Sequence, residues 1–479
     1  MKNLVALGLL VLGAGCGGSN HPVDDGGVGD AAIAGDAGCT DDGGCGAKQA
    51  GQALLVHEYA DAFQAGTACA APIDWTALAN GAAQTVLDGD GSSAVLYRAM
   101  RSIQLGVPEG HQELFYPGCG DEGSTPYQES TWYGVCGRPH GNAVVVTQAR
   151  SGNTLGLAVG DQIVGTSRWT AGATFFDQIA KEPVCGSSMP SVGAQHENAA
   201  ASLFGLVRAG DTLTVQDVGG TLRTVTAPTH DAMSAWCIAP FGGVDDFEAK
   251  AMTRGDGVVV IRVPGFLSSA HPLPDPATQA SYAQWVSDYV ARLATTLDGV
   301  KDAPAIVWDA RSNTGGSPEV ALAIVAGMPG AKAGVLSKGF RRVEGSDPFA
   351  YQPAPIASYS FNATVGGPLA YGGKVAVLID GLTYSAGDFF AYAVHHFSGA
   401  LLVGRPSAGA FGYGGSASVT IGTPPEFAYT VDFMKSVDDQ GVPLEANEVM
   451  PDLVVEYDPA DLAAGRDTVL EAAVSALLK

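Results

Sequence analysis

The chain has 479 residues, of which 46% are hydrophobic and 65 are glycines, so it can bury sizeable cores and is too long for a single ordinary domain. Its 49 acidic and 25 basic side chains give a formal net charge of −24. This negative charge argues against nucleic acid as a partner, because a surface that binds nucleic acid must carry positive charge.

The N-terminus predicts a secretory signal. Lys2 precedes the apolar run LVALGLLVLGAG, which is too short to span a bilayer and is typical of a signal peptide. The small residues 13–15 and the Cys16 that follows them resemble a bacterial lipoprotein box. We therefore predict a signal peptide over 1–16 and lipidation of Cys16, which would hold the chain on a membrane. The alternative is an ordinary signal peptide followed by a cysteine that has no role.

Residues 17–50 are mainly Gly, Asp and Ala with few large apolar side chains, which predicts a flexible tether. The spacing of the Asp residues does not match a calcium-binding loop. Of the eight cysteines, seven remain after Cys16, and export makes disulfides expected. Cys39 and Cys45 are close enough to pair, and the odd number leaves one thiol over. Because neither Cys-x-x-Cys nor paired-histidine spacing occurs, we expect no metal and no cofactor.

The next two regions differ in their hydrophobic pattern. In ALLVHEYADAFQ and SSAVLYRAMRSIQLG, apolar residues recur at three- and four-residue steps, which predicts a helical subdomain over 51–131. From 132 to 228, β-branched runs separated by Gly and Asp predict short strands. Within them, GLAVGDQIVGT resembles the Gly-Leu-x-x-Gly-Asp-x-Ile signature of a PDZ domain, a module that binds extended peptides at a sheet edge. The alternative is a small β-domain that serves only as a spacer.

The last region, 229–479, has the pattern of a layered α/β domain. Its runs GVVVIRV, APAIVWDA and KVAVLID are nearly all apolar, which is typical of strands buried on both faces. Helical stretches such as ASYAQWVSDYVARLATTL alternate with them. In such a layer we expect the turns that follow the strands to carry the chemistry.

Four segments of this region, in order, resemble one family of serine peptidases. AIVWDARSNTGGSPEVALAIV resembles its strand, Asp-x-Arg-x-Asn-x-Gly-Gly turn and helix, and KVAVLIDGLTYSAGDFFAYAV resembles its nucleophile segment. ALLVGRPSAGAFG and GVPLEANEVMPDLVVEYDPADLAAGRDTVLEAAV resemble the segments that follow. The family includes the tail-specific (C-terminal processing) proteases, the tricorn core and the chlamydial protease-like activity factor. The resemblance spans 51–479 and implies an α/β fold: a crotonase/ClpP-like catalytic core, an N-terminal helical subdomain and an inserted PDZ-like domain.

Ser385 permits two interpretations. With Asp388 it forms the Ser-x-x-Asp pattern of a helix capping box, whereas the resemblance implies that it is the nucleophile. At a helix N-terminus, free N–H groups and the helix dipole favour negative charge. The backbone of Ala386 and that of Gly315 or Gly316 resemble the two sides of an oxyanion hole, where glycine allows close approach because it has no Cβ.

The base is the least direct assignment. In the tail-specific branch it is a Lys within Gly-Lys-Gly, but this chain has Gly-Ala-Phe at 409–411. Lys374 and Lys435 do not match that position. His111 stands in LGVPEGHQEL, which resembles the Leu-Gly-Asp-Gly-His-Thr segment that ends the helical front in members using a Ser-His-Glu arrangement. The resemblance therefore implies His111 as the base, with His271 as the second choice.

Glu445, in PLEANEVMPD, matches the Glu that precedes the Pro-Asp of the family. A carboxylate of this kind orients the histidine and stabilises its charged form. Glu448 is the second choice. A histidine base with the ordinary pKa near 6.5 predicts activity that rises through about pH 6 to 7.

Together these features predict an exported, lipid-anchored serine endopeptidase that acts on polypeptides and contacts the membrane only through its anchor. Gly17 after the lipidated cysteine favours the outer membrane of the cell envelope. We expect that deleting 132–228 would leave Ser385 reactive and would lower turnover of long polypeptides more than that of short esters. Two alternatives stay open, a non-catalytic binding protein like the retinoid-binding repeats, which share the fold, and a PDZ peptide-binding scaffold. The oligomeric state is left open.

Overall fold

The computed structural model describes residues 45–69, 72–115, 124–125, 128–129, 133–182, 186–229, 249–267, 273–274, 278–343, 350–414, 419–421, 427–429 and 432–479. The predicted lipidation site Cys16, the tether cysteine Cys39 and the alternative base His271 lie outside these residues.

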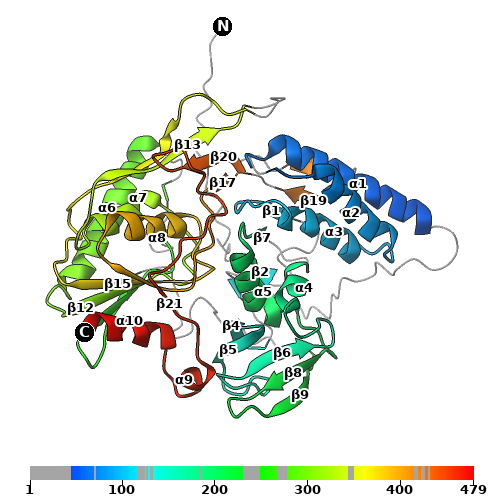
Figure 1. Ribbon diagram of the computed structural model, residues 1–479, viewed down its shortest axis with the longest axis horizontal. Coiled ribbons are helices and arrows are strands. Elements are labelled where there is room, and N and C mark those ends of the chain that lie inside the picture. Colours follow the sequence, from blue (N-terminus) through cyan, green and yellow to red (C-terminus); the bar gives the residue numbers. More distant parts are fainter. Residues whose placement is uncertain are drawn as a thin grey trace, which may run out of the picture.

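Three helices form the N-terminal part, drawn in blue in Figure 1: α1 (Cys45–Gly66), α2 (Trp75–Leu87) and α3 (Ser93–Leu105). Asp74 and Ser92 cap α2 and α3 by accepting the backbone N–H groups of Ala77 and Val95. The apolar residues at helical spacing meet in one buried cluster that includes Val56, Tyr59, Phe63, Met100 and Ile103.

The β-rich region forms a five-stranded antiparallel sheet, at the bottom right of Figure 1. Its order is β4 (Val135–His140), β5 (Ala143–Ala149), β6 (Gln162–Thr166), β8 (Thr212–Gln216) and β9 (Leu222–Thr226). Two helices belong to this region, α4 (Phe175–Ala180) and α5 (Val192–Leu206), and α5 packs on β4. Buried apolar residues of the sheet and both helices form its core. We call residues 133–229 the inserted domain.

The central sheet of the molecule has the order β10-β11-β12-β15-β16-β21. Its strands are β10 (Lys250–Thr253), β11 (Val259–Arg262), β12 (Ala305–Asp309), β15 (Lys374–Ile379), β16 (Leu401–Gly404) and β21 (Leu453–Val454). Only the pair β10 and β11 is antiparallel. The predicted mixed α/β class is confirmed.

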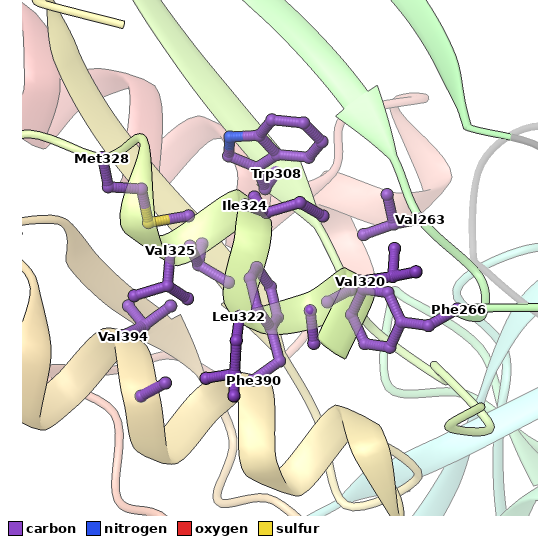
Figure 2. Close-up of a cluster of buried hydrophobic side chains, with 14 of the residues drawn as sticks. Val263, Phe266, Trp308, Val320, Leu322, Ile324, Val325, Met328, Phe390 and Val394 are labelled. Carbon is purple, nitrogen blue, oxygen red and sulfur yellow. The ribbon is translucent and has the colours of Figure 1, made fainter. Parts of the chain in front are cut away.

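Both faces of this sheet are covered, which explains its nearly continuous apolar strands. On β12, Ile306 and Trp308 face the cluster formed with α6 (Gln279–Asp298), α7 (Pro318–Ala326) and α8 (Ala386–Phe397), whereas Ala305 and Val307 face α10 (Thr468–Leu478). Figure 2 shows part of the first cluster, with side chains of α7 lying near Trp308 and near Phe390 of α8.

Two smaller sheets join parts of the chain that are far apart in sequence. One has the order β14-β13-β20-β17 and the other β18-β19-β1-β7. Their bounds are β1 (Glu113–Phe115), β7 (Gly186–Ser187), β13 (Gly334–Arg341), β14 (Ile356–Ala363), β17 (Tyr413–Gly414), β18 (Val419–Ile421), β19 (Phe427–Tyr429) and β20 (Asp432–Val437). The hairpin of β2 (Ser124–Thr125) and β3 (Gln128–Glu129) and the short helix α9 (Pro459–Ala463) complete the described elements. The sheet β18-β19-β1-β7 connects the helical front, the inserted domain and the core.

None of the helices in the described part of the chain is long and apolar enough to cross a membrane.

Candidate active site

Ser385 lies where strand β15 gives way to helix α8. It occupies the N-cap position of α8 with φ 59° and ψ −120°, a conformation that residues with a side chain rarely adopt. Its side chain makes no capping hydrogen bond. The capping-box interpretation is therefore wrong for this residue, and the strained backbone resembles that of residues held at functional sites.

Asp388, the other half of that pattern, has different partners. Its two carboxylate oxygens accept the backbone N–H groups of Gly409 at 2.8 Å and Ala410 at 2.9 Å. The side chain is fully buried, and burial raises the pKa of Asp388 to about 7. Asp388 thus ties the first turn of α8 to the loop after β16, and its carboxylate also interacts with the backbone N–H of Ser385 at the helix end.

His111 meets Ser385 although 274 residues separate them in the chain. The His111 Nε2 atom lies 2.9 Å from the Ser385 Oγ atom. The imidazole packs against the ring of Tyr384, with the two ring centroids 4.9 Å apart. Burial lowers the pKa of His111 to about 4. At neutral pH the imidazole is therefore uncharged and can accept a proton.

Glu445 lies beside the loop that carries His111. Its Oε1 atom accepts the backbone N–H of Gly110 at 2.8 Å, and the carboxylate is partly buried. Its neighbour Ala446 has a φ of 63° and donates its N–H to Gly409 O at 2.8 Å, which fixes the turn. The second choice, Glu448, faces the start of α5, because a Cβ added to Gly193 would lie 2.5 Å from its Oε1.

The glycine turn after β12 packs directly against the serine. Gly315 and Gly316 have φ values of 99° and 118°, and a Cβ on Gly315 would lie 2.6 Å from the Cβ of Ser385. Gly315 donates its N–H to Asn313 Oδ1 at 2.9 Å. Its N–H group is thus already used, whereas the absence of its Cβ leaves room beside the serine.

Buried ionic contacts hold this turn in place. The Arg311 guanidinium donates to Asp309 at 2.8 and 2.7 Å and to Asp467 at 2.9 and 2.7 Å. All three residues are buried, and the paired charges satisfy one another. Asp309 and Arg311 belong to the Asp-x-Arg motif, and Asp467 belongs to the C-terminal Gly-Arg-Asp segment. The sequence did not indicate that these two segments meet.

The two lysines that do not match the base position of the tail-specific branch lie in other surroundings. Lys374 donates to the backbone oxygen of Leu477, and Lys435 lies over the ring of Tyr351 at 3.7 Å. Neither contact involves Ser385. In the regions that the structure describes, no group of three or more His, Cys, Asp or Glu side chains could hold a metal ion.

Known proteins resemble the chain in fold. It matches a structure described as mature CPAF complexed with lactacystin at a TM-score of 0.60 and 15% identity, covering 90% of this chain and 98% of the other. A structure of mature CPAF matches at a TM-score of 0.57 and 15% identity, covering 87% and 94%. No curated protein matches the sequence.

One protein-family model, described as Peptidase family S41, matches residues 257–455. This range contains Ser385, both glycines of the turn and Glu445, while His111 reaches the site from outside it. Through this region the chain is similar to peptidase family S41, a family of serine peptidases.

Proposed function

We propose that the protein is an exported serine endopeptidase that hydrolyses peptide bonds through an acyl-enzyme on Ser385, with His111 as the base. The observation that carries this proposal is the 2.9 Å separation between His111 Nε2 and Ser385 Oγ, which is within the reach needed for proton transfer. The match of residues 257–455 to a peptidase family supports polypeptide substrates.

In the first step, the Ser385 Oγ attacks the scissile carbonyl while its proton passes to Nε2 of His111. Ala386 N–H at the start of α8 and Gly316 N–H are the donors proposed for the oxyanion, because Gly315 N–H is already bonded to Asn313. Gly315 contributes space instead. The positive end of the α8 dipole further favours the developing charge.

In the second step, the imidazolium gives its proton to the leaving amine, and His111 then activates the water that releases the acyl group. A base that is neutral at pH 7 suits both transfers. Glu445 is proposed as the orienting acid, supported by its hydrogen bond to Gly110, the residue before the base.

Three finer assignments complete the proposal. The region that carries Ser385 is a crotonase/ClpP-like core, and the inserted domain is PDZ-like. Lipidation at Cys16 anchors the protein to the outer membrane. A disulfide at Cys136 supports an oxidising compartment.

Labelling with a fluorophosphonate probe tests the central claim, since the probe reacts with an activated serine. We expect the purified protein to be labelled and Ser385→Ala to be unlabelled. Ser360→Ala is the matched control, because the bonds of Ser360 Oγ in the described part of the chain lie within the β13–β14 hairpin, to Ile356 O and from Gly339 N–H. A folded parent protein without label would favour a binding protein instead, and label retained by Ser385→Ala would place the reactive residue elsewhere.

A further inference from the structure

The inserted domain reaches the loop that carries the base. Ser188, just after β7, is fully buried. Its Oγ donates to the backbone oxygen of Glu109 at 2.8 Å, and its N–H donates to that of Gln112 at 2.8 Å. One residue of the inserted domain thus bonds to the backbone on both sides of His111.

The loop that carries His111 is also held by contacts outside the inserted domain. Gly110 N–H donates to the carboxylate of Glu445 at 2.8 Å, and strand β1, which directly follows the loop, pairs with β7 and β19. The loop therefore has anchors in both the inserted domain and the core. A short loop fixed at successive backbone groups leaves its side chain little freedom to drift.

The segment that carries Ser188 also touches the nucleophile loop. Met189 and residues of α5 form a buried cluster with Leu382 and Tyr384, which directly precede Ser385. In addition, Tyr384 packs against the ring of His111. The inserted domain is therefore part of the wall around the serine and the histidine.

We propose that Ser188 is a positioning residue for His111. It does not touch the reacting atoms but fixes the loop so that Nε2 stays within hydrogen-bond reach of Ser385 Oγ. An error of about 1 Å in such a contact can cost about a hundredfold in rate. The inference rests on the proposed role of His111 as the base.

A double-mutant cycle tests this. We expect Ser188→Ala to lower the rate of fluorophosphonate labelling about tenfold, as expected when a buried carbonyl loses its donor. In the His111→Ala background the same change should lower the residual rate less than about twofold, because residues that act through one another are not additive.

Ser191→Ala is the matched control. Ser191 caps α5 by accepting Ala194 N–H at 3.1 Å and lies three residues from Ser188. Ser191→Ala therefore destabilises the same segment at its α5 end and leaves the bonds of Ser188 to the 109–112 loop in place. We expect a lower Tm and a labelling rate within about twofold of its parent in both backgrounds. If Ser188→Ala does not fold, Ser188→Cys, which keeps the size but donates weakly, takes its place with the same expectation.

The outcomes separate the two proposals. A parental rate in Ser188→Ala, or an equal drop in both backgrounds, overturns the positioning role. A drop in Ser191→Ala as large as that in Ser188→Ala also overturns it, because general loosening of the domain would then suffice. If instead His111→Ala is labelled at the parental rate, the proposed base is wrong.

Discussion

At the scale of single residues, the site depends on an imidazole whose charged form is disfavoured by its surroundings. Burial lowers the pKa of His111 to about 4, below the value near 6.5 of an exposed histidine. The neutral form is the one that accepts a proton, so the structure moves the expected start of activity toward acid.

The pH profile follows from this shift. Because His111 loses its proton as the pH rises through about 4, kcat/KM for a short ester should rise there and level off by about pH 6. The measurement is a profile from pH 3.5 to 8 at constant ionic strength. A midpoint near 6.5 would indicate a solvated base and contradict the burial.

The loss of kcat in variants of the site should depend on the role of the residue that is changed. His111→Ala should reduce kcat about as much as Ser385→Ala, by about 10⁴-fold or more, since both belong to one proton-transfer unit. Glu445→Gln should cost less, about a hundredfold, because Glu445 orients rather than transfers. Peptide hydrolysis by each variant gives the comparison.

Two histidine controls accompany these variants. His196→Ala removes a hydrogen bond with Asp177 on the inserted domain, and His271→Ala removes the second-choice base. Both should stay near parental activity. An inactive His271→Ala beside an active His111→Ala would reverse the assignment of the base.

At the scale of elements, Asp388 joins the first turn of α8 to the 409–410 backbone. Asp388→Asn places an amide where one N–H donor needs an acceptor, so we expect it to lower the free energy of unfolding by about 1–3 kcal/mol. Urea denaturation at fixed pH measures this loss, and unchanged stability would show that the buried bonds contribute nothing net.

The loss of stability in Asp388→Asn should also depend on pH. The pKa of Asp388 is raised from 3.8 to about 7 in the folded state, so between these values the folded chain holds more protons than the unfolded one. The contribution of Asp388 to stability is therefore full near pH 4 and declines as the pH approaches 7. The difference in the free energy of unfolding between the parent and Asp388→Asn should shrink from pH 4 to pH 7. A difference that widens with pH would contradict the raised pKa.

Regular elements could be predicted from the sequence because their signals are local. The apolar runs of the central sheet and the helical periodicity of the front mark buried faces directly. The sheet β18-β19-β1-β7 could not be predicted, because its strands have only two or three residues and pair across long sequence separations.

The site likewise has residues with a local sequence signal and residues without one. Ser385, Gly315, Glu445 and His111 were found through motifs, and the structure brings them together. Ser188 has no motif, since its role comes only from which backbone oxygens it meets. The Ser-x-x-Asp pattern indicated the contact of Asp388 with the backbone of Ser385, but it could not indicate the two donors that Gly409 and Ala410 supply.

At the scale of the whole molecule, the contacts of the inserted domain change the expectation for its deletion. Since Ser188 and Met189 contact the loops of His111 and Ser385, deleting 132–228 should abolish labelling of Ser385 rather than spare it. Probe labelling combined with a thermal unfolding curve measures this. Labelling at the parental rate in a folded deletion variant would show that the inserted domain is not needed for the reactivity of Ser385.

Anchoring is a second property of the whole chain. If Cys16 carries acyl chains, Cys16→Ala should move the protein from the detergent phase to the aqueous phase in a phase-partition assay, because about 0.8 kcal/mol is lost for each CH₂ no longer buried. Equal partitioning of variant and parent would show that the cysteine is not lipidated.

The buried contacts of Arg311 have a consequence for biosynthesis. The glycine turn beside Ser385 is fixed by Arg311, and Arg311 depends on Asp467, which comes more than 150 positions later in the chain. A ribosome must therefore add Glu445 and then Asp467 before the serine, its base and the turn can assemble. Under the proposed function, a chain still being synthesised should therefore lack activity until these C-terminal residues have been added.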